Sequence, residues 1–122
     1  MDGERFVVAD YVSATERRTV YLRRGAEGMV TIGEQSQGEM TRLSYGDALH
    51  RSELHAQERF VAPVLLPLTG AADLVQALDV LFSENEVSLA DLMDELCAHG
   101  VEFWFSSLGD VTGPALRRFC VA

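Results

Sequence analysis

Apolar and polar residues alternate over the first third of the chain, as expected for strands that bury one face. Residues Arg5 to Ser13 are rich in Val, Tyr and Phe, and Thr19 to Arg24 alternates in the same way. A third run covers Met29 to Gly33, after a short glycine-bounded turn. Short connections between such runs predict an antiparallel meander. The polar residues 34–39 are predicted to form a loop.

The middle of the chain has a less regular pattern. Ser44 with Asp47 three residues later is typical of a helix N-terminus, so residues 44–55 are predicted as a short helix, with a long loop as the alternative. The run from Phe60 to Leu68 is apolar but contains two prolines, which cannot donate to a sheet ladder. It is therefore predicted to be an edge strand or an extended crossing segment.

The helical pattern is clearer after residue 68. A helix is predicted from Thr69 or Gly70 to about Ser83, and Ser88 is predicted to cap a second helix with Asp91 at the capping-box position. Gly100 is a natural stop, because glycine adopts the left-handed conformation at little cost.

The last elements complete an α+β pattern. Residues 101–106 are predicted to form a strand, and residues 115–121 a last strand or a short helix. The order of elements predicts one domain over residues 1–122, an antiparallel β-meander sheet with an acidic helix pair packed on one face.

Charge is distributed unevenly along this pattern. The formal net charge is −9, and the segment from Phe60 to Leu116 carries nine carboxylates and no Lys or Arg. The ten arginines lie at or before Arg59 and at 117–118, and the chain has no lysine. This balance disfavours direct binding to nucleic acid or to an anionic membrane. A surface of one sign repels itself, so the asymmetry indicates a basic partner.

The helix predicted to begin after Ser88 carries the strongest candidate surface. Asp91, Asp94 and Glu95 are spaced i, i+3 and i+4, so they share one side, opposite the leucines. Carboxylates one helical turn apart are separated by roughly 5–6 Å, a spacing close to that of successive phosphates. The face is thus predicted to bind a basic protein, as a nucleic-acid mimic in the extreme case; the alternative is a solvated face that only keeps the protein soluble. Four further carboxylates extend the surface: Asp73, Asp79, Glu84 and Glu86.

Trp104 is a second candidate contact residue. In a strand, Phe103 and Phe105 share one face while Glu102 and Trp104 take the other. If the phenylalanines are core, Trp104 stands outward beside a carboxylate and can anchor an arginine-rich partner. The alternative is a strand covered on both faces, with Trp104 packed.

The arginine pairs of the first hairpin, residues 17–18 and 23–24, admit three interpretations. They are predicted to compensate nearby glutamates, with a patch for an anionic ligand as an alternative. The third interpretation is association of this basic end with the acidic half of another copy, head-to-tail or about a two-fold axis.

Only His50, Glu53 and His55 look like catalytic or metal-binding residues. On a helix the two histidines, five residues apart, point in different directions, whereas His50 and Glu53 share a face. Cys97 and Cys120 form no metal motif and are predicted to be reduced core thiols. No phosphate-binding loop, dinucleotide fingerprint or nucleophile elbow occurs, so we predict neither an enzyme nor a bound cofactor or metal.

The sequence thus predicts a small, cytoplasmic, non-catalytic protein that binds and blocks a basic protein partner, of which a nucleic-acid-binding protein is one kind. Small acidic domains of this kind occur among toxin-immunity proteins and phage-encoded inhibitors such as anti-CRISPR proteins, a likeness of charge and size with no motif behind it. The predicted contact residues are Asp91, Asp94, Glu95, Glu84, Glu86 and Trp104. The alternatives are a ligand-binding, metal-binding or enzymatic domain using His50, Glu53 and His55, and a self-associating structural module or homodimer.

Overall fold

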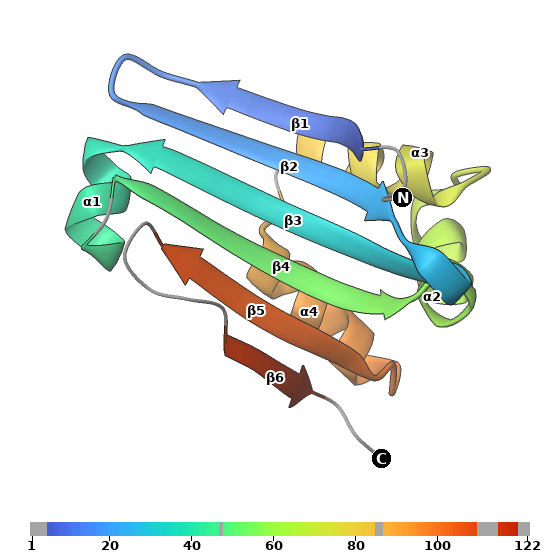
Figure 1. Cartoon of the computed structure of the whole chain (residues 1–122). Helices are drawn as coiled ribbons and strands as arrows, with labels where there is room; N and C mark the ends of the chain where they lie inside the picture. The colour runs from blue at the N-terminus through green and yellow to red at the C-terminus, as the bar shows by residue number, and fades with distance from the viewer. Residues whose placement is uncertain (1–4, 47, 85–86, 110–114, 120–122) are drawn as a thin grey trace.

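Six antiparallel strands form one sheet in sequence order, β1-β2-β3-β4-β5-β6, in this computed structural model (Figure 1). The structure describes residues 5–46, 48–84, 87–109 and 115–119, with side chains as far as residue 106 except that of Tyr45. Every pair of neighbouring strands is antiparallel, which confirms the predicted meander. The strands are β1 (Arg5–Val12), β2 (Glu16–Arg24), β3 (Met29–Gly38), β4 (Leu49–Gln57), β5 (Phe103–Gly109) and β6 (Ala115–Phe119).

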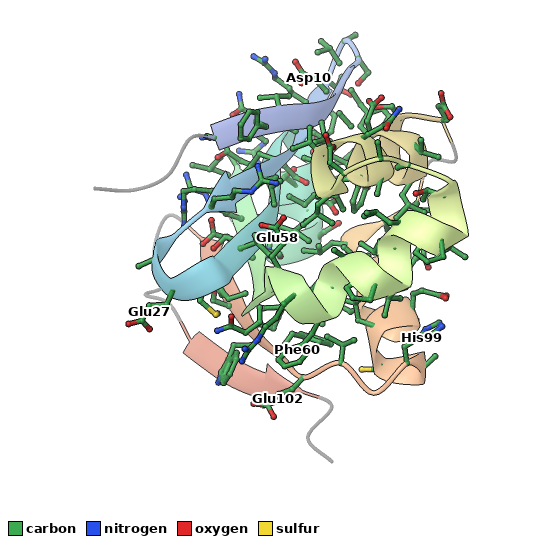
Figure 2. All side chains as sticks on the ribbon, turned by 90° about the vertical axis from the view of Figure 1, so that its right-hand side faces the viewer. Asp10, Glu27, Glu58, Phe60, His99 and Glu102 are labelled. Atoms are coloured by element: carbon green, nitrogen blue, oxygen red, sulfur yellow. The ribbon has the colours of Figure 1, made fainter. Side chains whose placement is uncertain are left out.

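The helices lie on one side of this sheet, as both views of the molecule show (Figures 1 and 2). A single 3₁₀ turn, η1 (Ala26–Gly28), joins β2 to β3, and α1 sits at the end of the sheet between β3 and β4. The α+β class predicted from the sequence is confirmed. The helices are α1 (Glu39–Tyr45), α2 (Glu58–Thr69), α3 (Leu74–Asp79), the π-helical turn η2 (Val80–Glu84) and α4 (Leu89–Ala98).

The core lies between the sheet and α2, α3, η2 and α4. Alternate residues of the central strands point toward the helices, so Leu22, Ile32 and Leu54 are fully buried while their neighbours face the other way. Phe82 of η2 and Leu96 of α4 fill the space above them and are 0 % exposed. The opposite sheet face is covered by none of the described helices, and we call it the open face (Figure 2).

The predicted loop at residues 34–39 and the predicted helix at 44–55 are both wrong. Strand β3 continues to Gly38 because β2 and β4 run beside it throughout, and Glu34 pairs with Val20 on one side and Ser52 on the other. Helix α1 precedes the predicted position and ends at Gly46, whose φ of 85° needs glycine. Asp47, half of the predicted cap, lies outside the described residues. Backbone ladder bonds hold these polar strand segments in place regardless of their composition.

The proline-containing run is also different from its prediction, because it forms helix α2. Pro63 and Pro67 are four residues apart and both exposed, so the missing N–H groups lie on the solvent side. Val61 and Leu65, also four apart, are fully buried against the sheet. Burial of this stripe outweighs the two lost helix bonds. Among the described residues no single helix is long and apolar enough to cross a membrane, although α2 with α3–η2, bent by 56°, reaches the required length together.

The helix predicted to follow Ser88 is confirmed as α4. Ser88 Oγ accepts the Asp91 amide at 3.1 Å, and the Asp91 carboxylate accepts the Ser88 amide at 3.0 Å, which makes a complete capping box. Gly100 follows the helix with a φ of 72°. The helix predicted to start at Thr69 or Gly70 begins later in the chain, because its N-cap is Asp73. The last predicted element is the strand β6.

Cys97 does not fit its predicted role as a reduced core thiol. It is exposed on α4, and its sulfur is disulfide-bonded. The buried stripe of the helix is Leu89, Leu92 and Leu96, which leaves the next residue on the outer side. The only other cysteine in the sequence, Cys120, lies outside the described residues. Disulfides are typical of oxidising compartments, so the redox state of Cys97 must be controlled in any solution experiment.

Candidate functional site

The α4 carboxylates lie on the solvent side of the helix, as the spacing predicted, but they are not equivalent. Asp91 is engaged in the capping box, and its hydrogen bond from the Ser88 amide lowers the pKa of this carboxyl below its ordinary value. Asp94 is exposed. Glu95 is half-buried and lies 3.6 Å from Nδ1 of His99. Asp94 and Glu95 are therefore the α4 carboxylates that a partner can contact without disturbing the helix cap.

A groove runs along the same side of α4. It has a volume of about 430 Å³ and lies between the end of α2, η2 and α4. Leu68 and Leu81 contribute to its apolar wall, while Asp91 and Glu95 supply carboxylates. Leu68 is 54 % exposed although it is a large apolar side chain. An apolar wall beside carboxylates fits a segment that presents both aliphatic and cationic side chains.

The carboxylates of the preceding segment belong to a different part of the surface. Asp73 accepts the Gln76 amide at 2.8 Å as the N-cap of α3. Asp73 and Asp79 line a shallower groove of about 350 Å³ beside β1. Figure 1 places α3 behind β1 and β2, and α4 behind β4 and β5. Glu84 is exposed, and Glu86 lies outside the described residues. The expected surface is thus divided into an α3 group and an α4 group.

Trp104 lies on the opposite side of the sheet from α4. Phe103 is fully buried and Phe105 packs against the core, so Trp104 points to the open face, half-buried and opposite His55 in the strand register. The alternation allowed this orientation, with a packed Trp104 as the alternative. This orientation also means that Trp104 and the α4 carboxylates are separated by the sheet and cannot belong to one contact surface.

The three residues that looked catalytic are separated in the same way. They lie on strand β4 rather than on a helix, and a strand turns successive side chains to opposite faces. His50 points to the helix side, where it hydrogen-bonds Ser52 at 3.3 Å and lines a cleft of about 270 Å³ with Phe105. Glu53 and His55 point to the open face. The prediction that His50 and Glu53 share one face assumed a helix, and it is wrong because both residues lie on a strand.

Polar residues are buried on the open face in a connected network. The Tyr21 hydroxyl donates to the Glu53 carboxylate, and Arg23 lies 3.7 Å and His55 4.0 Å from the same carboxylate. Tyr21 is only 1 % exposed and Glu53 only 6 %. Burial, and then the Glu53 bond, raises the pKa of the Tyr21 phenol. Tyr21 can lie across the sheet because Gly33 has no side chain; a Cβ there would clash with the phenol ring.

His55 is held between two hydroxyl groups in this network. Its Nδ1 lies 2.8 Å from Thr31 Oγ1, and its Nε2 lies 3.2 Å from Ser106 Oγ. Burial is the main cause that lowers the pKa of His55 below 6.5, opposed by the nearby Glu53 charge. The ring is therefore held in place mainly in its neutral form. Among the described residues no group of three His, Cys, Asp or Glu side chains is arranged to hold a metal ion.

Arginines share the open face with this network, whereas the sequence analysis grouped them only as neighbouring pairs in the first hairpin. The Arg5 guanidinium stacks 4.1 Å from the centre of the Tyr21 ring, and Arg17 forms a two-bond pair with Asp10 at 2.9 and 3.2 Å. Arg51 donates to Gln35 at 3.1 Å. The signal was present in the strand pattern, because residues 17, 19, 21 and 23 alternate with the buried apolar residues of β2.

Comparison of the chain with protein families, with curated proteins and with solved structures found no match. The geometry of the surfaces themselves is thus what a functional proposal rests on.

Proposed function

We propose that this protein is a non-catalytic interaction protein whose α4 surface binds and blocks a basic surface of another protein. The observation that carries the proposal is the groove along α4, where an apolar wall that includes the exposed Leu68 meets the carboxylates Asp91 and Glu95. The partner segment would insert aliphatic side chains and place Arg or Lys opposite Asp94 and Glu95. A basic groove that holds nucleic acid is one such surface.

Charge supports the proposal through the rate of encounter. No Lys or Arg occurs between Phe60 and Leu116, so the helix layer, formed by α2, α3, η2 and α4, has only Arg59 at the start of α2 to offset its carboxylates. A net charge of −9 attracts a cationic groove over a distance of about one Debye length, roughly 8 Å at physiological salt. Inhibition then follows from occupying the groove, as in immunity proteins and phage-encoded inhibitors. We assign no catalytic step to the chain. The sequence-based expectation of a cytoplasmic location conflicts with the disulfide at Cys97, which is typical of an oxidising compartment.

The groove also decides which predicted contacts belong together. Glu95 and Leu68 line the groove, and together with the neighbouring exposed Asp94 they form the proposed contact surface. Asp91 contributes mainly by holding the helix N-terminus. Glu84 on η2 is a peripheral charge. Trp104 remains a predicted contact residue, but for a second surface on the open face.

The test is a pull-down from host lysate, followed by binding kinetics on the captured protein with two charge-matched variants. Asp94→Asn/Glu95→Gln removes one carboxylate that lines the groove and the exposed one next to it on α4, and Asp79→Asn/Glu84→Gln removes two elsewhere in the helix layer. We expect the first pair to lower the association rate on the order of tenfold at low salt, and the second pair to change it far less. Leu68→Ser should raise the dissociation rate instead, because it removes an apolar contact.

Equal losses for both charge pairs would mean that only net charge matters and that α4 is no specific site. Unchanged kinetics for all three variants would remove the proposal. The experiment is run with and without reductant, because Cys97 lies on the same helix and is disulfide-bonded.

A further inference from the structure

The open face carries an excess of positive charge that the helix side lacks. Its described strand residues include four arginines and two carboxylates, and one of these carboxylates, Glu53, is buried and accepts the Tyr21 hydroxyl. The other, Asp10, is already paired with Arg17. The arginines are Arg5, Arg17, Arg23 and Arg51.

This face is also organised before any partner arrives. Tyr21 is fixed between Gly33 and the Arg5 guanidinium, and His55 is fixed between Thr31 and Ser106. Because these side chains already occupy one position, binding there costs little conformational entropy. Two large apolar side chains at the edge, Val7 and Val12, are 59 % and 71 % exposed.

We propose that the open face binds the acidic helix layer of a second copy of this chain, so that copies associate head-to-tail. Charge complementarity selects this occupant, since α4 offers Asp94 and Glu95 and carries no Lys or Arg, and the open face offers Arg5, Arg17 and Arg23. Packing two open faces together about a two-fold axis would instead set these arginines against one another.

The size of the open face suits a stable contact. Six strands span about 24 Å across, and the nine residues of β2 or β4 extend about 30 Å. The resulting area of roughly 700 Å² is close to the ~800 Å² that each partner buries in a standard interface. A head-to-tail contact leaves one of each surface free at the ends, so the assembly grows beyond a dimer unless it closes into a ring.

Self-association would use the same α4 carboxylates as the proposed function and in that respect rests on it. The open face of a neighbouring copy would compete with the basic partner for Asp94 and Glu95. High local concentration of this protein would thus hold it in an inactive assembly, and a tighter partner would release it.

The experiment uses two variants that each damage one surface. Arg5→Glu/Arg17→Glu alters the open face, and Asp94→Lys/Glu95→Lys alters the helix layer. Sedimentation velocity over a wide range of protein concentration, with the disulfide intact, measures their assembly. We expect the wild type to associate at moderate salt, with affinity falling on the order of tenfold or more at high salt, and each variant alone to stay monomeric.

An equimolar mixture of the two variants is the decisive sample. Each retains the surface that the other lost, so the mixture should form a one-to-one dimer that cannot grow further. Pairing also shows that both variants are folded. Arg42→Glu, which changes an exposed arginine on α1, serves as a charge control and should assemble like the wild type.

Three results would overturn the inference. They are a wild type that stays monomeric at every concentration, a mixture that fails to pair, and a helix-layer variant that still dimerises alone, which would indicate open face packed on open face. If the wild type is monomeric while the groove variants still lose the captured partner, the proposed function stands and only self-association is wrong. If the wild type assembles but the groove variants bind the captured partner normally, self-association stands and the proposed function is wrong.

Discussion

The helix layer and the open face stabilise this protein by different physical means. The helix layer turns large apolar side chains such as Phe82 and Leu96 inward and leaves its carboxylates in water. The open face instead buries polar groups, Tyr21, Glu53 and Thr31, that satisfy one another through hydrogen bonds. The first region depends on volume and the second on pairing. Mutations should therefore have different signatures in the two regions.

Shortening a buried side chain of the helix layer should have the largest effect on stability. Phe82→Ala removes a fully buried aromatic side chain and leaves a cavity, so we expect unfolding free energy to fall by about 3–5 kcal/mol. Phe60→Ala is the matched control, because Phe60 is 51 % exposed and should change stability by roughly 0.5 kcal/mol. Denaturant unfolding with the disulfide intact measures both. Similar losses for the two phenylalanines would mean that the η2 turn is not an anchor of the core.

The pairing on the open face should show a smaller, coupled effect. Tyr21→Phe keeps the ring but leaves the buried Glu53 carboxylate without that donor, at an expected cost of about 1–3 kcal/mol. Combined with Glu53→Gln, the losses should be non-additive by about 0.5 kcal/mol or more. Tyr11→Phe is the control, since the buried Tyr11 hydroxyl has no hydrogen-bond partner among the described residues. Strict additivity would contradict a connected network.

The pH dependence of stability should show the smallest effect of the open face. Burial lowers the pKa of His55, so the unfolded chain binds the proton more readily than the folded protein below pH 6.5. The stability that the neutral ring supplies is present above that pH and is lost as the pH falls. We expect His55→Asn to flatten the decrease in unfolding free energy on acidification relative to the wild type. An unchanged slope in this variant would place the titrating group elsewhere.

Prediction from the sequence succeeded where the structure is decided locally. The cap of α4 is correct because Ser88 and Asp91 bond each other's amides within one turn, and Gly100 ends the segment through its own backbone freedom. The early strands are correct because their alternation is visible in short windows. For α4 the outward direction of Asp91, Asp94 and Glu95 follows from the same helical periodicity.

Prediction failed where one face of an element is polar for reasons that lie elsewhere in the molecule. Strand β4 alternates clearly only at Leu54 and Ala56, because His50 and Ser52 line a cleft that the helices leave open. Helix α2 was missed because two prolines argue against a helix unless both missing N–H groups face solvent. Neither fact can be read from neighbours in the chain.

By itself the sequence determined the antiparallel meander, the helix with its cap and stop, and the segregation of negative charge after Arg59, because each depends on residues within a few positions of one another. Only the tertiary structure decided how those pieces share surfaces. The sheet separates Trp104 from Asp94 and Glu95, the positions of α3 and α4 divide the carboxylates, and strand pairing gathers arginines from β1, β2 and β4 around Glu53. These outcomes depend on contacts between segments far apart in the chain, and a local pattern of residues carries no information about such contacts.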